Sequence, residues 1–107
     1  MNVIINNQEY EVQLEKNETV DALLKMLPLE MNMTELNGNE KYYYFNQTLP
    51  TNAKVPDQIE KGDIMLYGNN CLVIFYKSFQ TNYSYTKIGH IDELPELGYN
   101  NVTVKIK

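Results

Sequence analysis

Arginine and tryptophan are absent from this chain, and cysteine and histidine each occur once. A single cysteine, Cys71, excludes an internal disulfide, and because it lies in an apolar run we expect a buried thiol that acts as a small core side chain. Nine lysines supply all of the positive side-chain charge, and the net charge is −5. Nucleic-acid binding needs a basic surface that neutralises phosphates, so this composition argues against DNA or RNA as a partner.

Long apolar segments are also missing. There is no run of the roughly 18 apolar residues that a membrane helix needs, and no secretory leader with a basic start and an apolar middle. We therefore expect no membrane association and a cytoplasmic location, with an exported form left open if a leader before Met1 has been removed. The length of 107 residues predicts a single domain, 1–107, large enough for one hydrophobic core.

No catalytic or metal-binding constellation is visible. The only histidine, His90, begins the segment "HIDELPE", whose three carboxylates are interpreted as a solvated loop rather than as metal ligands. Asp63 has no second acid at a spacing that would suggest general acid catalysis. The sequence therefore predicts no metal, no cofactor and no catalytic residue.

The patterns that are present indicate strands. Apolar residues alternate with polar ones in residues 9–15 and 102–107, which is typical of strands with one buried face. Only Val20, Leu23, Leu24 and Leu27 follow a helical spacing, which predicts one helix over about 19–27, capped by Asn17 or Thr19 and ended by Pro28. The remaining strands are expected at residues 3–5, 29–36, 42–45, 64–67, 71–76 and 82–91, with a bulge at Gly89, and a loop with one helical turn is expected at 49–58.

About eight short strands, one helix and closely spaced turns predict an all-β fold, a closed antiparallel β-barrel. The strand-strand-helix opening is also similar to a ubiquitin-like β-grasp, but five further strand signals exceed what that fold accommodates. Two continuous apolar runs flank Gly68-Asn69-Asn70, which predicts a hairpin in the middle of the sheet because such strands are buried on both faces.

Three segments carry a family resemblance: "LPLEMNMTELNGNEKYYYF", "LPTNAKVPDQIEKGDIMLYGNNCLVIFYK" and "YSYTKIGHID". Together they resemble the small bacterial cyclophilin-like proteins over nearly the whole chain, most specifically in "LYGNNCLVIFYK" and Ile88-Gly89. The resemblance implies a compact cyclophilin barrel. Cyclophilins themselves are peptidyl-prolyl isomerases, which favour the twisted amide with an Arg beside an apolar pocket for the proline ring.

The residues that correspond to the cyclophilin site depart from that pattern. Tyr43 or Tyr44 would occupy the place of the catalytic Arg, and Lys41 is no substitute because an ammonium lacks the planar guanidinium fork. Tyr85 stands where the pocket His would be, and no Trp occurs in 79–81. The resemblance places Phe75 at the proline-ring Phe. The predicted ligand groove consists of Tyr43, Met65, Tyr67, Phe75, Phe79 and Tyr85.

Three functional hypotheses follow. The first is a non-catalytic binding module for a Pro-containing peptide or a small molecule. The second is a weak peptidyl-prolyl isomerase, which rests on fold analogy alone. The third is a structural domain that self-associates through exposed aromatic side chains. The sequence leads us to expect a monomer or a weak homo-oligomer.

Overall fold

Residues 1–107, all described by a computed structural model, form eleven strands and one helix. The all-β prediction is confirmed. In chain order the elements are β1 (Asn2–Ile5), β2 (Gln8–Glu11), β3 (Gln13–Leu14), α1 (Glu18–Leu24), β4 (Leu29–Leu36), β5 (Glu40–Tyr44), β6 (Gln58–Ile59), β7 (Asp63–Tyr67), β8 (Cys71–Phe75), β9 (Phe79–Gln80), β10 (Thr86–His90) and β11 (Val102–Ile106).

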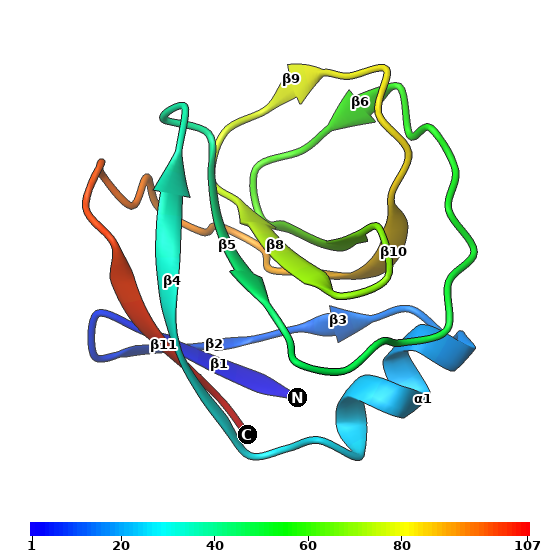
Figure 1. The fold of residues 1–107 in the computed structure, drawn as a ribbon. Coiled ribbons are helices and arrows are strands. Elements are labelled where there is room, and N and C mark those ends of the chain that lie inside the picture. The colour runs from blue at the N-terminus through cyan, green and yellow to red at the C-terminus, as the bar shows by residue number, and fades with distance from the viewer.

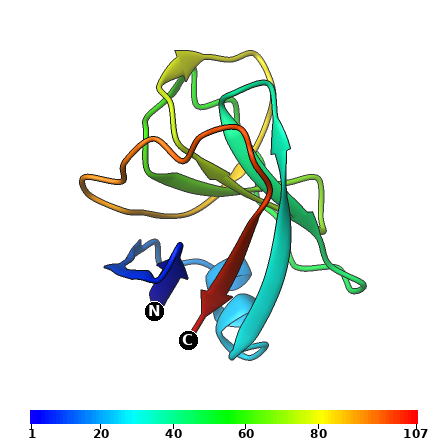
Figure 2. The same cartoon turned by 90° about the vertical axis from the view of Figure 1, so that its left-hand side faces the viewer.

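Nine strands form one antiparallel sheet in the order β2-β1-β11-β4-β5-β8-β7-β10-β3. Its two edge strands, β2 and β3, are the halves of one chain segment separated only by Val12. The first half pairs with β1 and the second with β10, so the sheet curls into a nearly closed barrel (Figure 1). Counted as one strand, β2 and β3 bring the barrel to eight strands, as predicted. The two chain ends lie together, because Asn2 and Lys107 exchange backbone hydrogen bonds (Figure 2).

The helix α1 is shorter than the sequence indicates. It begins after Asn17, whose side chain accepts a hydrogen bond from the Val20 N–H at 2.8 Å, as the predicted cap requires. The prediction that it continues to residue 27 is wrong, since it ends at Leu24. Beyond that point the Leu27 N–H bonds the Leu24 carbonyl, three residues back, so the chain tightens into a turn before Pro28. The helix of this protein lacks the length and apolar content that a membrane crossing requires.

One strand boundary and one loop also differ from prediction. The strand expected over 82–91 begins only at Thr86, because the preceding tyrosine segment lies across the loop at Lys54, joined to it by a single bridge with Tyr85. The same loop contains no helical turn, and β6 follows it. The bulge predicted at Gly89 is confirmed by a shift in register between Lys87 and Gly89. A side chain at Gly89 would meet the backbone of β3 at 2.7 Å.

The strand β8 is buried along its whole length, because it carries apolar clusters on both faces. Leu72 and Ile74 point into the barrel core, whereas Cys71, Val73 and Phe75 point outward into a second cluster. The short β6–β9 pair lies over part of this outer face, where it contributes Ile59 and Phe79 (Figure 1). The prediction of a central hairpin, turning at Gly68, is therefore confirmed.

A buried lysine, which the sequence patterns do not reveal, joins β5 to β4 and to the segment at residues 98–100. Lys41 is fully buried and donates hydrogen bonds to Glu35 Oε1 at 2.9 Å and to the carbonyls of Gly98 and Asn100 at 2.7 Å. Tyr76 donates a further bond to the same Glu35 oxygen at 2.6 Å. Burial disfavours the charged form of Glu35, but these hydrogen bonds outweigh it and lower the pKa of the carboxyl. All three donors of Lys41 are thus satisfied, and its charge is paired.

Candidate functional site

The candidate site lies on the outer face of β5, β8 and β7, where the strand register places its residues side by side. Tyr42, Val73 and Met65 form one row across the three strands. Tyr44, Cys71 and Tyr67 form the next row. The β6–β9 pair covers the Phe75 end of this face, where the Phe79 ring lies 5.6 Å from the Phe75 ring, and the Cys71 end stays open.

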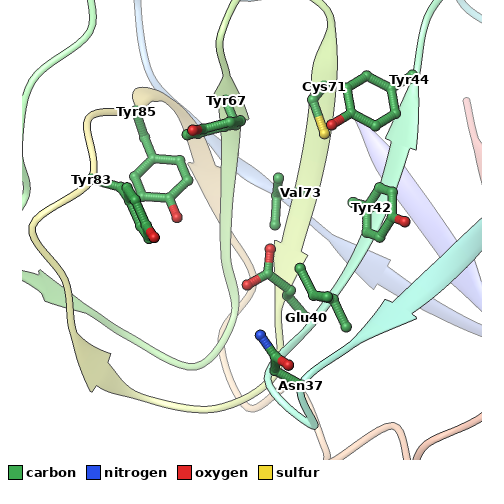
Figure 3. Close-up of a pocket in the computed structure, with 10 residues that line it drawn as sticks. Asn37, Glu40, Tyr42, Tyr44, Tyr67, Cys71, Val73, Tyr83 and Tyr85 are labelled. Carbon is green, nitrogen blue, oxygen red and sulfur yellow. The ribbon is translucent and has the colours of Figure 1, made fainter.

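The open end forms a pocket of about 330 Å³ (Figure 3). This volume lies at the small end of the range for ligand sites, roughly 300–1,000 Å³. Its floor is β8, and its walls come from β5 on one side and from β7 with the 83–85 segment on the other. The lining residues are Leu36, Asn37, Glu40, Tyr42, Tyr44, Tyr67, Cys71, Val73, Tyr83 and Tyr85.

Five tyrosines form the walls of this pocket. On the β5 side, the rings of Tyr42 and Tyr44 lie 5.7 Å apart and nearly perpendicular. On the opposite side, Tyr67 contacts Tyr83 at 6.2 Å and Tyr85 at 5.6 Å between ring centroids. Tyr44, Tyr67 and Tyr83 are 57%, 43% and 65% exposed, whereas Tyr85 is 6% exposed. Three rings therefore form the rim, and Tyr85 belongs to the base of the wall.

One ionisable carboxyl, Glu40, faces into the pocket. It sits on β5 opposite Phe75, and its carboxylate points into the space between Tyr85 and Val73 (Figure 3). Burial, together with repulsion from Glu35, raises the pKa of Glu40 to about 7. The pocket therefore changes charge close to neutral pH.

Burial also acts on two other titratable groups of the pocket, Cys71 and Tyr85. Burial raises the pKa of the Cys71 thiol, so the thiolate that a nucleophile needs is disfavoured. Burial and the nearby Glu40 raise the pKa of Tyr85 to about 12. The chemistry on offer is therefore aromatic surface, hydroxyl hydrogen bonding and one carboxyl that exchanges a proton near neutrality.

The structure distributes the six residues of the predicted groove among three places. Tyr67 and Tyr85 line the pocket. Met65 and Phe75 are buried in the outer cluster and do not line the pocket, and Phe79 lines an adjoining depression that shares Asn37, Glu40, Tyr83 and Tyr85 with the pocket. Tyr43 lies on the other face of β5, packed against the barrel core beside Phe45.

Eight of the ten pocket residues were not among those predicted, and four of the eight supply most of its walls and its only charge: Glu40, Tyr42, Tyr44 and Tyr83. The first three lie on one face of β5, because side chains at even positions in 40–44 point to the same side of the strand. Strand alternation could therefore have placed them together. Because positions 42, 43 and 44 are all tyrosine, hydrophobicity alone does not tell which face is which. The buried Lys41 is the residue that determines it, since its side chain occupies the inner face.

His90 lies away from this pocket, on β10. Its Nδ1 is 2.8 Å from Asp63 Oδ1, and its Nε2 is 3.5 Å from Asp92 Oδ1. No group of three or more His, Cys, Asp or Glu side chains is arranged to hold a metal ion. We therefore describe His90 as part of a polar surface cluster with Asp63 and Asp92.

The barrel, and the position of its pocket on an outer sheet face, can be compared with known proteins. The model of the Cyclophilin-like family matches residues 3–107. The chain belongs to the cyclophilin-like family. Comparisons with curated proteins and with solved structures gave no match. In this cyclophilin-like barrel the outer face of β5, β8 and β7 carries tyrosines and a glutamate, and no arginine is available to any part of it.

Proposed function

We propose that this cyclophilin-like protein is a binding module that holds a peptide or a small ligand in the tyrosine pocket without isomerising it. The observation that carries the proposal is the pocket over Cys71 and Val73 of β8, between two walls of tyrosine rings and beyond the part of this face that β6 and β9 cover. Tyrosine suits such a role, because each ring offers a large contact area and a hydroxyl with little loss of side-chain entropy.

The composition of the chain supports a non-catalytic role. Rotation about an X–Pro bond has a barrier near 20 kcal/mol, and a catalyst must stabilise the twisted amide. No guanidinium exists in the chain to do this. Lys41 is next to the pocket residue Tyr42 in sequence, but it is buried on the inner face of β5 with all of its donors engaged.

Binding is tested by titrating isotope-labelled protein with short Pro-containing peptides and a metabolite panel, followed by amide and ring chemical shifts. We expect saturable shifts at Tyr42, Tyr67, Val73 and Tyr85, with no change at Tyr10, which lies on β2 and does not line the pocket. A panel that leaves the pocket resonances unmoved contradicts the proposal. A protease-coupled assay measures isomerisation separately, and turnover above the uncatalysed rate would favour the isomerase hypothesis.

A second candidate function is self-association. The exposed rings of Tyr44, Tyr67 and Tyr83 form the rim of the pocket, and Leu36, 41% exposed, lies beside them. A second copy of the chain seated on this rim would bury the same surface that a ligand uses. Light scattering at increasing concentration distinguishes the two functions, because a protein that stays monomeric has no homomeric use for the rim.

A further inference from the structure

The only charge that the pocket lining can carry is negative. Glu40 is the only charged residue among those that line it, and also among those that line the adjoining depression. The lysines and His90 lie elsewhere, and the whole chain carries a net charge of −5. A ligand that enters this pocket therefore meets a carboxyl and no cation.

Glu40 differs from its neighbour Glu35 in having no partner. Glu35 accepts hydrogen bonds from Lys41, Tyr76 and the Gly38 N–H, with the last at 2.6 Å. Glu40 has no hydrogen bond or ion pair that offsets its burial. Of these two carboxyls, Glu35 is paired with a lysine inside the protein, whereas Glu40, which faces the pocket, has no cation beside it.

The spacing of the tyrosine walls fits a cation between them. The walls rise from β5 and β7, which are separated by one strand, and two strand spacings amount to about 9–10 Å. For rings that stand upright on these strands, a group held above Val73 midway between them lies about 5 Å from each wall, within the roughly 6 Å over which an aromatic face attracts a cation. Tyr42 and Tyr44 are nearly perpendicular, as are Tyr67 and Tyr83, so each wall presents rings in two orientations.

We infer that the pocket binds an alkylammonium group, held between the tyrosine walls above Val73 and paired with the carboxylate of Glu40. This inference rests on the proposed binding function and names its ligand class. A methylated ammonium suits the site better than a bare one, because its methyl groups contact the aromatic rings that make up most of the lining, whereas a bare ammonium has three donors that only Glu40, Asn37 and the tyrosine hydroxyls could accept. The group is carried either by a free amine or by a methylated lysine in a peptide.

The decisive experiment compares choline with 3,3-dimethylbutanol, its neutral isostere, by chemical-shift titration at constant ionic strength. We expect choline to shift the resonances of Tyr42, Tyr67, Tyr85 and Glu40, and the neutral isostere to bind at least about tenfold more weakly. A short peptide with trimethyllysine and the same peptide with norleucine form the second arm. Tighter binding of the methylated peptide than of choline assigns the site to peptide-borne cations, and the reverse assigns it to free amines.

Variants test the role of the carboxyl. Glu40→Gln keeps the shape of the side chain and removes its charge, and we expect choline affinity to fall about five- to tenfold near pH 8. Glu11→Gln makes the same charge change on the exposed β2 and should leave the affinity unaltered. Tyr83→Leu, which removes a rim ring that is largely exposed, should weaken choline binding while Tyr99→Leu, outside the pocket, should not.

Binding should also depend on pH. The groups that face Glu40 are Glu35, Cys71 and Tyr85, together with the remaining wall tyrosines Tyr42, Tyr44, Tyr67 and Tyr83. The pKa of Glu35 is lowered and those of Cys71 and Tyr85 are raised, so Glu40 is the group that titrates near pH 7. Choline affinity should rise between about pH 6 and pH 8 in the native protein and stay constant in Glu40→Gln.

Failure of this inference and failure of the proposed function give different results. Equal binding of choline and 3,3-dimethylbutanol overturns the cation preference and leaves the binding function standing. Binding of Pro-containing peptides without any response to choline or trimethyllysine does the same. Pocket resonances that respond to none of the probes overturn both.

Discussion

Replacing Glu40 with glutamine should stabilise the protein above pH 7 and leave its stability unchanged near pH 4.5. The pKa of this carboxyl is raised from 4.5 to about 7 by burial and by Glu35. The folded protein therefore keeps the proton to higher pH than the unfolded chain does. The stability that the neutral carboxyl contributes is complete below about pH 4.5 and is lost as the pH rises through 7. Glutamine is neutral throughout and escapes this loss.

The size of the effect follows from the shift. Each pKa unit corresponds to about 1.4 kcal/mol, so the rise of the Glu40 pKa from 4.5 to about 7 sets an upper limit of about 3.4 kcal/mol. The Glu40 side chain is partly exposed, and water weakens the effects of both burial and the Glu35 charge. We therefore expect Glu40→Gln to raise the free energy of unfolding by about 1–2 kcal/mol at pH 8.

Thermal and urea unfolding of the native protein, Glu40→Gln and Glu11→Gln between about pH 4.5 and pH 8 measures this difference. Each kcal/mol corresponds to about 4–8 °C in Tm for a domain near this size. The Tm gap between Glu40→Gln and the native protein should widen with pH, while the gap for the exposed Glu11→Gln stays nearly constant. A Glu40→Gln gap of the same size at every pH would refute the reasoning, because a shape effect does not titrate.

Three further substitutions test the fold. Lys41→Met should lower the free energy of unfolding by about 3–5 kcal/mol in urea, because it leaves the largely covered Glu35 carboxylate without its cation, and adding Glu35→Gln should recover part of the loss. Gly89→Ala should cost about 1–3 kcal/mol, since the new Cβ would meet the β3 backbone, and an unchanged urea midpoint would contradict the close approach. Asn17→Ala should cost about 1 kcal/mol by removing the helix cap, and amide exchange at Val20 should quicken.

Local patterns predicted the barrel but not the way in which it closes. Residues 9–15 alternate as a single strand, and the structure uses the two halves of that strand on opposite edges of the sheet, on either side of Val12. Alternation reports which side chains face a core and carries no information on the pairing partner. The β6–β9 pair was missed for a different reason, because two-residue strands are too short to show any period.

The pocket was harder to predict than the fold, because its decisive residues depend on distant contacts. The burial of Lys41 requires Glu35 from β4 and two carbonyls from the 98–100 segment, none of which a local window contains. Once Lys41 is inside, Tyr43 must follow it inward, and Tyr42 and Tyr44 must face the pocket. The aromatic content of a groove could be predicted from the sequence, whereas the choice among three consecutive tyrosines could not.

The strand β5 links stability and binding, because the charge on its inner face is paired within the chain and the charge on its outer face is not. On the inner face, Lys41 is neutralised by Glu35 within the chain. On the outer face, Glu40 has no internal cation, so its ionisation lowers stability unless a ligand supplies the missing charge. A bound alkylammonium group should therefore raise the Tm more at about pH 8 than at about pH 6, and the difference should vanish in Glu40→Gln. A ligand that raised the Tm equally at both pH values would interact with the tyrosines alone.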